Sequence, residues 1–362
     1  MMDTICGARA YSLDMYAAGR YFLECAGLDD PARDAMELLC AAAGSDRATL
    51  LARSMPNESA SVSASASVDA SAGVSIGSGM DAELPCHIKK TYDAYLARRA
   101  KREPIQYIIG EWEFMGLPFI VNRDVLIPRP DTECLVECVA GEIAGTRSPL
   151  ILDLCTGSGC IGISLAHLLR DARIVAADIS ARALGVAERN AQLNGVSDRV
   201  SFVLGDLYQP VDIYMADSTS GTRPDAMPVA HPDAHPDAHP DARPDARPDA
   251  IFDAICANPP YIACADLPSL PEDVRCYEPA IALDGGTSGL DFYGRIAQGA
   301  AARLKPGGLL ATEVGADQAK DVARIFERHG FAQPKTLRDL CGIERVVYAF
   351  KRECAKFRLF ID

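Results

Sequence analysis

Residues 150–162 read Leu-Ile-Leu-Asp-Leu-Cys-Thr-Gly-Ser-Gly-Cys-Ile-Gly, a short apolar run that leads directly into a glycine-rich turn. The run predicts a buried strand. The glycines allow a sharp turn and leave bare backbone where a ligand can approach the N-terminus of the next helix. A second apolar run ends at Asp178, about 20 residues after Gly157, where an acidic side chain can bind both hydroxyls of a ribose. Together they indicate a nucleotide-type site on a strand-helix-strand unit.

Two other interpretations of these residues stay open at this point. Gly157, Gly159 and Gly162 also fit the G-x-G-x-x-G pattern of dinucleotide binding, although no second mononucleotide-binding half is evident. Asp178 could instead be a helix-capping acid.

The pattern around this unit alternates strand and helix and therefore predicts an α/β protein with a doubly wound, Rossmann-like parallel sheet. A helix is expected from Asp131, which would cap it, with one apolar face. After Gly330, two short extended pieces should form a terminal antiparallel pair. The expected strands are 149–154, 173–178, 200–205, 251–257 and 308–314, and the terminal pair is 333–337 and 345–350. The apolar face of the helix expected from Asp131 consists of Leu135, Val136, Val139 and Ile143.

The chain before this helix divides into two parts. Residues 1–103 predict a small helical domain, because 11–53 and 82–102 show helical spacing of apolar side chains, as at Ala35, Leu38, Leu39 and Ala42. Residues 104–130 are apolar and broken by Gly and Pro, which suggests a hairpin connector, and the α/β domain then spans 131–362.

Two segments look like insertions. Residues 57–80 are almost wholly Ser, Ala, Gly and Val, and residues 223–250 repeat His/Arg-Pro-Asp-Ala. The first cannot bury enough surface to offset its ordering entropy, and a proline at every fourth residue of the second excludes a regular helix or central strand. Tandem duplication explains the spacing of His231, His235 and His239, so no metal site is expected.

Composition argues against several classes of protein. The 362 residues carry a net charge of −14, which lacks the basic footprint of a nucleic-acid binder. No apolar run approaches the ~20 residues of a membrane span, and the first residues lack the pattern of a signal peptide. The 13 cysteines include no Cys-x-x-Cys pair, which favours reduced thiols in the cytoplasm.

The turn after the strand at 251–257 reads Asn258-Pro259-Pro260-Tyr261. Proline fixes φ and lacks an N–H, so this backbone offers carbonyl acceptors beside the Asn258 oxygen. Such a turn suits the NH2 of a planar amide or a nucleobase, although these four residues alone fit an ordinary proline-rich turn equally well.

Asp153, Gly157, Gly159, Asp178, Asp206 and the Asn-Pro-Pro-Tyr turn, in this order, resemble a class I S-adenosylmethionine-dependent methyltransferase that acts on an amino or amide nitrogen. Further segments narrow the resemblance to the HemK/PrmC family, the glutamine-N5 methyltransferases of peptide chain release factors. It extends from about residue 100 to 350. The segments are 104–110, 127–133, 277–279, 283–286 and 289–291.

The resemblance implies a role for each matching residue. The loop 155–159 should pass under the methionine part of S-adenosylmethionine, Asp178 should bind the ribose, and Asp206 and Leu207 should border the adenine. The turn should hold the substrate glutamine of a Gly-Gly-Gln motif. The implied cofactor-binding residues are Asp153, Cys155, Thr156, Gly157, Ser158, Gly159, Asp178, Asp206, Leu207 and Asn258, and the catalytic ones are Asn258, Pro259, Pro260 and Tyr261.

This chain departs from the family at two places. Cys155 stands where the family more often has glycine, and the insert 223–250 is foreign to the family. The insert falls at a surface connection between two parallel strands, so the sheet should tolerate it.

The expected mechanism orients the amide. The Asn258 oxygen and the Pro259 carbonyl would accept the two amide protons, and Tyr261 would pack on the amide plane. No general base is needed, so Glu278 and Glu313 are interpreted as structural.

The rival functions are methylation of an amino group on DNA or RNA, methylation of a ribosomal-protein glutamine, and a non-catalytic binding module. The family instead implies release factors as protein substrates, with no stable nucleic-acid or membrane binding. A cytoplasmic monomer is expected.

Overall fold

The computed structural model describes residues 12–54, 86–219 and 251–352. Both predicted insertions, 57–80 and 223–250 with its three histidines, lie outside the described residues. The chain divides into two compact units, Met1–Ile109 and Gly110–Asp362. The boundary between these units falls inside the segment 104–130.

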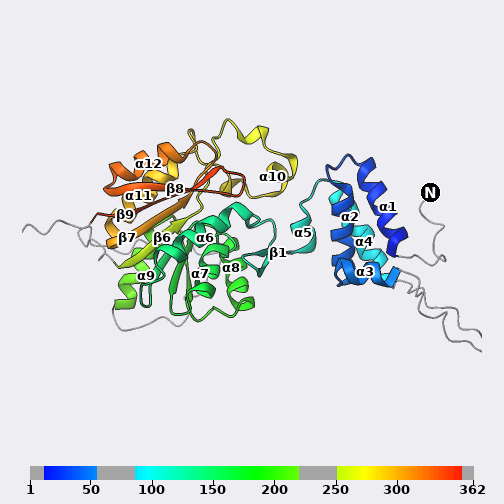
Figure 1. Ribbon diagram of the computed structural model, residues 1–362, viewed down its shortest axis with the longest axis horizontal. Coiled ribbons are helices and arrows are strands. Elements are labelled where there is room, and N and C mark those ends of the chain that lie inside the picture. Colours follow the sequence, from blue (N-terminus) through cyan, green and yellow to red (C-terminus); the bar gives the residue numbers. More distant parts are fainter. Residues whose placement is uncertain (1–11, 55–85, 220–250, 353–362) are drawn as a thin grey trace, which may run out of the picture. The chain divides into compact units, whose positions relative to one another are not determined.

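The first unit is helical, which confirms the prediction of an N-terminal helical region (Figure 1). Its core includes Leu38 and Leu39 together with Tyr92, whose hydroxyl donates to the Ala35 carbonyl at 3.1 Å. Asp30 caps the second helix by accepting from the Arg33 N–H. The helices are α1 (Ser12–Cys25), α2 (Pro31–Ala43), α3 (Arg47–Ser54), α4 (Cys86–Arg99) and α5 (Ile105–Ile109).

The second unit begins with an antiparallel hairpin, β1 (Glu111–Phe114) and β2 (Leu117–Ile120). Seven further described strands form one sheet in the order β5-β4-β3-β6-β7-β9-β8, parallel except for β8 and β9. This confirms the doubly wound sheet with a terminal antiparallel pair. The strands are β3 (Leu150–Leu154), β4 (Arg173–Asp178), β5 (Val200–Leu204), β6 (Phe252–Ala257), β7 (Leu304–Glu313), β8 (Phe331–Arg338) and β9 (Glu344–Lys351).

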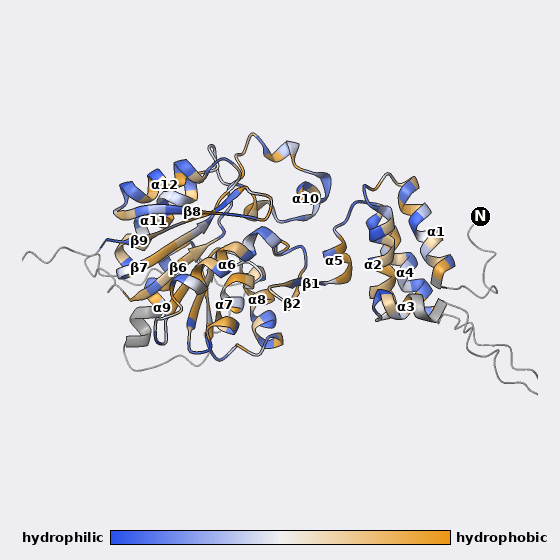
Figure 2. Cartoon of the chain, viewed as in Figure 1, coloured by the Kyte–Doolittle hydropathy of each residue, from blue (hydrophilic) through white to orange (hydrophobic). Residues whose placement is uncertain are grey.

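Helices cover both faces of this sheet. Successive strand residues point to opposite faces, so Ile151 joins a core with α6 and α7, whereas Leu152 joins a core with α11 and α12. Figure 2 shows the resulting apolar strands between helices with polar outer surfaces. The covering helices are α6 (Pro130–Glu142), α7 (Cys160–Leu168), α8 (Ala181–Leu193), α9 (Gln209–Thr219), α11 (Asp291–Arg303) and α12 (Ala319–Arg328), and the short α10 (Glu272–Tyr277) has no buried residues.

Two local predictions are wrong. Asp131 does not cap α6, because Pro130 occupies the first helical position and Arg129 precedes it. The fixed φ of proline suits that position, and Asp131 lies in the first turn, 3.0 Å from Arg345. Strand β7 begins at Leu304 rather than near 308, because Leu304 pairs with Phe252 ahead of a register shift.

No helix in the described part of the chain is long and apolar enough to cross a membrane. Within the same residues, no three His, Cys, Asp or Glu side chains are grouped as a metal site would require.

Candidate active site

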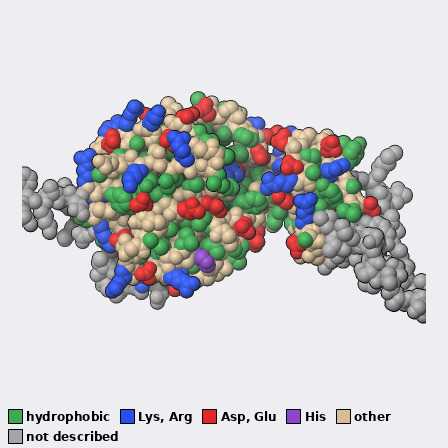
Figure 3. All heavy atoms as spheres, viewed as in Figure 1, with side chains coloured by type: hydrophobic (Ala, Val, Ile, Leu, Met, Phe, Trp, Pro, Cys, Tyr) green, Lys and Arg blue, Asp and Glu red, His purple; other side chains and the backbone are tan. Residues whose placement is uncertain are grey.

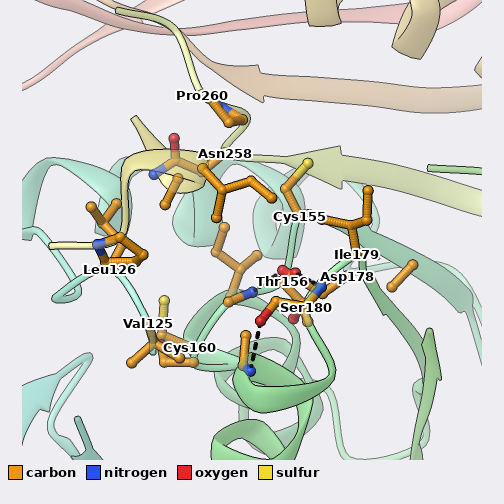
Figure 4. A pocket seen from close by; sticks show the side chains of 18 of the residues that line it. Val125, Leu126, Cys155, Thr156, Cys160, Asp178, Ile179, Ser180, Asn258 and Pro260 are labelled. Atoms are coloured by element: carbon orange, nitrogen blue, oxygen red, sulfur yellow. Dashed lines mark hydrogen bonds between the residues drawn. The ribbon is translucent and has the colours of Figure 1, made fainter. Parts of the chain in front are cut away.

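A pocket lies at the carboxyl ends of β3, β4, β5 and β6. The sheet order reverses between β3 and β6, and such a switch point is where doubly wound folds bind ligands. Figure 4 shows Cys155 between Asn258 and the segment Asp178–Ser180, with Val125 and Leu126 on the other side. The loops after four separate strands therefore meet around one cavity.

The glycine-rich loop depends on left-handed backbone. Gly157 has φ 55° and Gly159 has φ 82°. A Cβ at Gly159 would lie 2.7 Å from Ile163 and 3.1 Å from the Ala187 Cβ, so α7 can pack on α8 only with glycine here. A Cβ at Gly157 would meet nothing within 4 Å. Gly157 is therefore needed for its backbone conformation.

Asp153 lies beneath this loop and outside the pocket wall. Its Oδ2 accepts from the Thr156 hydroxyl at 2.5 Å and from the Gly162 N–H at 3.0 Å. Its Oδ1 has no hydrogen-bond partner among the described residues. Burial raises the pKa of Asp153 to about 7, against the lowering effect of the two hydrogen bonds. Asp153 thus shapes the loop rather than facing a ligand.

Asp178 ends β4 and lines the pocket. Its carboxylate accepts from the Gly157 N–H at 2.9 Å and from the Ser180 N–H at 2.8 Å, and burial raises its pKa. Ser180, not Asp178, is the N-cap of α8, since its hydroxyl accepts from the Ala183 N–H. Asp178 therefore joins the glycine loop to the end of the second strand, with its side chain at the cavity.

The pocket wall also contains most of the other expected cofactor residues. Cys155, Thr156, Gly157 and Ser158 come from the loop after β3, and Asp206 and Leu207 come from the loop after β5. Asp206 pairs with Arg295 of α11, which lines the same wall. Gly159 lies at the start of α7, outside the wall.

The Asn-Pro-Pro-Tyr turn follows β6 and contributes two residues, Asn258 and Pro260, to the wall. Pro259 and Tyr261 do not line it. The Asn258 Nδ2 donates to the Thr132 Oγ1 at 3.2 Å. The side-chain nitrogen of Asn258 is thus hydrogen-bonded to another protein side chain.

A second loop packs tightly against the turn. A Cβ at Gly285 would lie 2.7 Å from the Tyr261 Cα, and a Cβ at Gly289 would lie 2.4 Å from the Tyr261 carbonyl oxygen. Gln318 donates to the same carbonyl at 2.9 Å. These contacts give a physical reason for the glycines of the segments 283–286 and 289–291.

The expected set omitted one whole side of the pocket. Residues 124–129 line it, although the sequence indicated 127–129 only as part of a family segment and 124–126 only as part of the connector 104–130. The buried Glu278 holds this segment by accepting from the Ile127 N–H at 3.4 Å and from the Arg129 guanidinium. Burial raises the pKa of Glu278, and Arg129 opposes the rise. The opposite charges of Arg129 and Glu278 were the available sequence signal for this contact, but only the fold shows that the two residues form an ion pair.

The doubly wound sheet, its glycine loop, the acidic residues after β4 and β5 and the polar turn after β6 define a class I methyltransferase. A family model described as "Methyltransferase small domain" matches residues 130–217, and one described as "PrmC N-terminal domain" matches residues 75–110.

Curated relatives narrow this class. A release factor glutamine methyltransferase of Clostridium acetobutylicum is 40% identical over 263 residues, which is 72% of this chain and 80% of the relative. That of Geobacter sulfurreducens is 42% identical over 255 residues (70% and 75%), and that of Cereibacter sphaeroides 35% identical over 330 (90% and 94%). The chain belongs to the family of release factor glutamine methyltransferases.

Proposed function

We propose that this chain transfers a methyl group from S-adenosylmethionine to the side-chain amide nitrogen of the glutamine in the Gly-Gly-Gln motif of peptide chain release factors. One observation carries the proposal beyond the family relationship. The Asn258 Nδ2 is hydrogen-bonded to Thr132, which leaves the Asn258 Oδ1 as an acceptor beside the pocket. An acceptor at that place suits an incoming NH2 group.

The chemistry of the pocket fits the cofactor that a methyltransferase family implies. The open face of Gly157 admits a ligand to bare backbone, and Asp178 offers a carboxylate to a ribose diol. Apolar side chains such as Ile179 and Leu207 complete a wall suited to an adenine ring, with Asp206 at its edge. When bound, S-adenosylmethionine supplies an electrophilic methyl group on a sulfonium.

The turn has to orient a poor nucleophile, because the lone pair of an amide nitrogen is delocalised into its carbonyl. The Asn258 Oδ1 at the pocket wall would accept one of the two amide protons, which helps to aim the nitrogen at the methyl group and stabilises the positive charge that develops on it. The proton leaves after transfer, so no general base is required. Tyr261 supports the turn from outside the pocket wall.

The face of the molecule seen in Figure 3 favours a protein substrate over a nucleic acid. On this face, Lys and Arg side chains are scattered among Asp and Glu and form no continuous basic track. A track of that kind is what a phosphate backbone would need. Release factors act in translation, so we expect the enzyme to work in the cytoplasm, and as a monomer.

The test uses tritiated S-adenosylmethionine with five acceptors: a purified release factor, its Gln→Ala variant in the Gly-Gly-Gln motif, a ribosomal protein, DNA and RNA. Only the wild-type release factor should become labelled. Label on the Gln→Ala variant would overturn the assignment of the glutamine. Label on the ribosomal protein or a nucleic acid, without label on the release factor, would overturn the substrate class.

A further inference from the structure

Glu313 is the last residue of β7 and lies beside the Asn-Pro-Pro-Tyr turn, with 1% of its surface exposed. Its Oε2 accepts from the Thr132 hydroxyl at 2.6 Å, and its Oε1 accepts from the Tyr261 hydroxyl at 3.4 Å. Thr132 in turn accepts from the Asn258 Nδ2 at 3.2 Å. One buried carboxylate is therefore connected to both the first and the last residue of the turn.

The direction of these hydrogen bonds follows from counting protons. An ionised carboxylate can only accept, so the single hydroxyl proton of Thr132 goes to Glu313. Only a lone pair of the Thr132 oxygen then faces Asn258, and that lone pair requires a donor. The Asn258 amide must present its NH2 to Thr132 and its oxygen to the other side.

We propose that Glu313 is a positioning residue for methyl transfer, acting through Thr132 to fix the orientation of the Asn258 amide and through Tyr261 to hold the end of the turn. The inference rests on the proposed function, because the Asn258 oxygen matters only if it accepts from a substrate NH2. An inverted Asn258 amide would place its own NH2 against that group and repel it. Glu313 itself need not touch the substrate.

The surroundings of Glu313 allow this relay to depend on pH. Arg345 from β9 favours the charged form, Asp131 from α6 opposes it, and Tyr261 and Thr132 donate to it. Tyr293 of α11 donates instead to the Glu313 backbone carbonyl. Burial outweighs these contacts and raises the pKa of Glu313 to about 7. A protonated Glu313 can donate to Thr132, which frees the Thr132 proton to point at Asn258 and removes the bias on its amide.

The test compares variants that differ by one hydroxyl. Thr132→Val removes the relay while keeping the shape of the side chain, and Thr132→Ser keeps the hydroxyl. Thr312→Val is the matched control, because Thr312 is equally buried beside Glu313 and its hydroxyl has no hydrogen-bond partner among the described residues. Release factor methylation and the Kd for S-adenosylmethionine are measured for each.

We expect Thr132→Val to lower kcat at least about tenfold, the scale of a lost orienting contact, with Kd changed less than about threefold. Thr132→Ser and Thr312→Val should stay within about threefold of the wild type in kcat. The wild type and Thr132→Ser should also lose kcat as the pH falls through about 7, and Glu313→Gln should lack that loss.

Equal kcat in Thr132→Val and Thr312→Val would overturn the relay while the proposed function stands. The same acidic loss in Glu313→Gln as in the wild type would also overturn the role of Glu313. A wild-type enzyme that left the release factor unlabelled would overturn the proposed function, and the relay with it. Methylation of the release factor by the wild-type enzyme therefore distinguishes a failure of the relay from a failure of the proposed function.

Discussion

Cys155 has φ 57° in the loop beneath the proposed methyl donor, a backbone conformation that L side chains adopt at a cost of about 1–2 kcal/mol. This conformation favours glycine at that position. The Cys155 side chain lines the pocket and is half-buried, and desolvation of the thiol raises its pKa well above the ordinary value and keeps it protonated.

Cys155→Gly should therefore leave the free energy of unfolding unchanged or raise it, because relief of the left-handed conformation offsets the extra entropy that glycine gives the unfolded chain, about 0.5–1 kcal/mol. Cys134→Gly is the matched control, since Cys134 lies in the middle of α6. It should lose about 1 kcal/mol. Urea unfolding of both variants measures the difference, and an equal loss in the two would contradict the strain at Cys155.

A second prediction at the scale of one residue concerns Asn258. Asn258→Ala should lower kcat roughly 10²–10³-fold, as for loss of one preorganised polar group, while the Kd for S-adenosylmethionine stays nearly unchanged. Single-turnover methylation with a release factor, beside calorimetric cofactor binding, separates the two quantities. Near-normal turnover would remove Asn258 from the mechanism.

At the scale of elements, the segment 124–129 depends on a buried carboxylate that lies far away in the sequence. Glu278 is 6% exposed and satisfies the Ile127 N–H and the Arg129 guanidinium. Val125, Leu126 and Ile127 form one wall of the pocket. The contacts of Glu278 therefore connect the stability of this unit to the shape of its ligand site.

Glu278→Ala should cost about 2–3 kcal/mol of unfolding free energy. Loss of one partner of a fully buried ion pair would cost more unfolding free energy. The Arg129 side chain is 35% exposed, so water partly solvates the charge that the substitution leaves unpaired. The same variant should bind S-adenosylmethionine more weakly, because the segment 124–129 loses the Glu278 contacts that hold it in the pocket wall.

Asp321→Ala is the control for this prediction. It removes an exposed ion pair with Arg324 on α12 and should change stability by less than about 0.5 kcal/mol. Unfolding curves and cofactor titrations of the two variants provide the comparison. Unchanged cofactor affinity in Glu278→Ala would show that the segment keeps its position without this carboxylate.

At the scale of the whole molecule, the sequence predicted what short-range patterns encode. Apolar runs such as 150–154 predicted the strands, and the spacing from Gly157 to Asp178 indicated the nucleotide-type site. The relay of Asn258, Thr132 and Glu313 was not predictable, because its members lie 126 and 181 residues apart and meet only through the sheet order. Glu313 and Glu278 were interpreted as structural from the sequence, and their hydrogen-bond partners came only from the fold.

Asp153 contributes to the pH dependence of global stability, in the same direction as Glu313, whose pKa is also raised to about 7. The pKa of Asp153 is about 7 in the folded protein and roughly 4 in an unfolded chain, so the folded state binds more protons between these values. The free energy of unfolding therefore falls as the pH rises through this window, and the loss is complete above pH 7.

Asp153→Asn is a neutral substitute, because the asparagine oxygen can accept from Thr156 and Gly162 in place of Oδ2. The wild type should lose roughly 2–3 kcal/mol relative to this variant between pH 5 and pH 7. Urea unfolding at pH 5, 6, 7 and 8 measures the difference, with Asp321→Asn as an exposed control that should follow the wild type. Parallel pH profiles of wild type and Asp153→Asn would mean that Asp153 is ionised in the folded protein throughout this range, and the loop would then be held by a charged carboxylate.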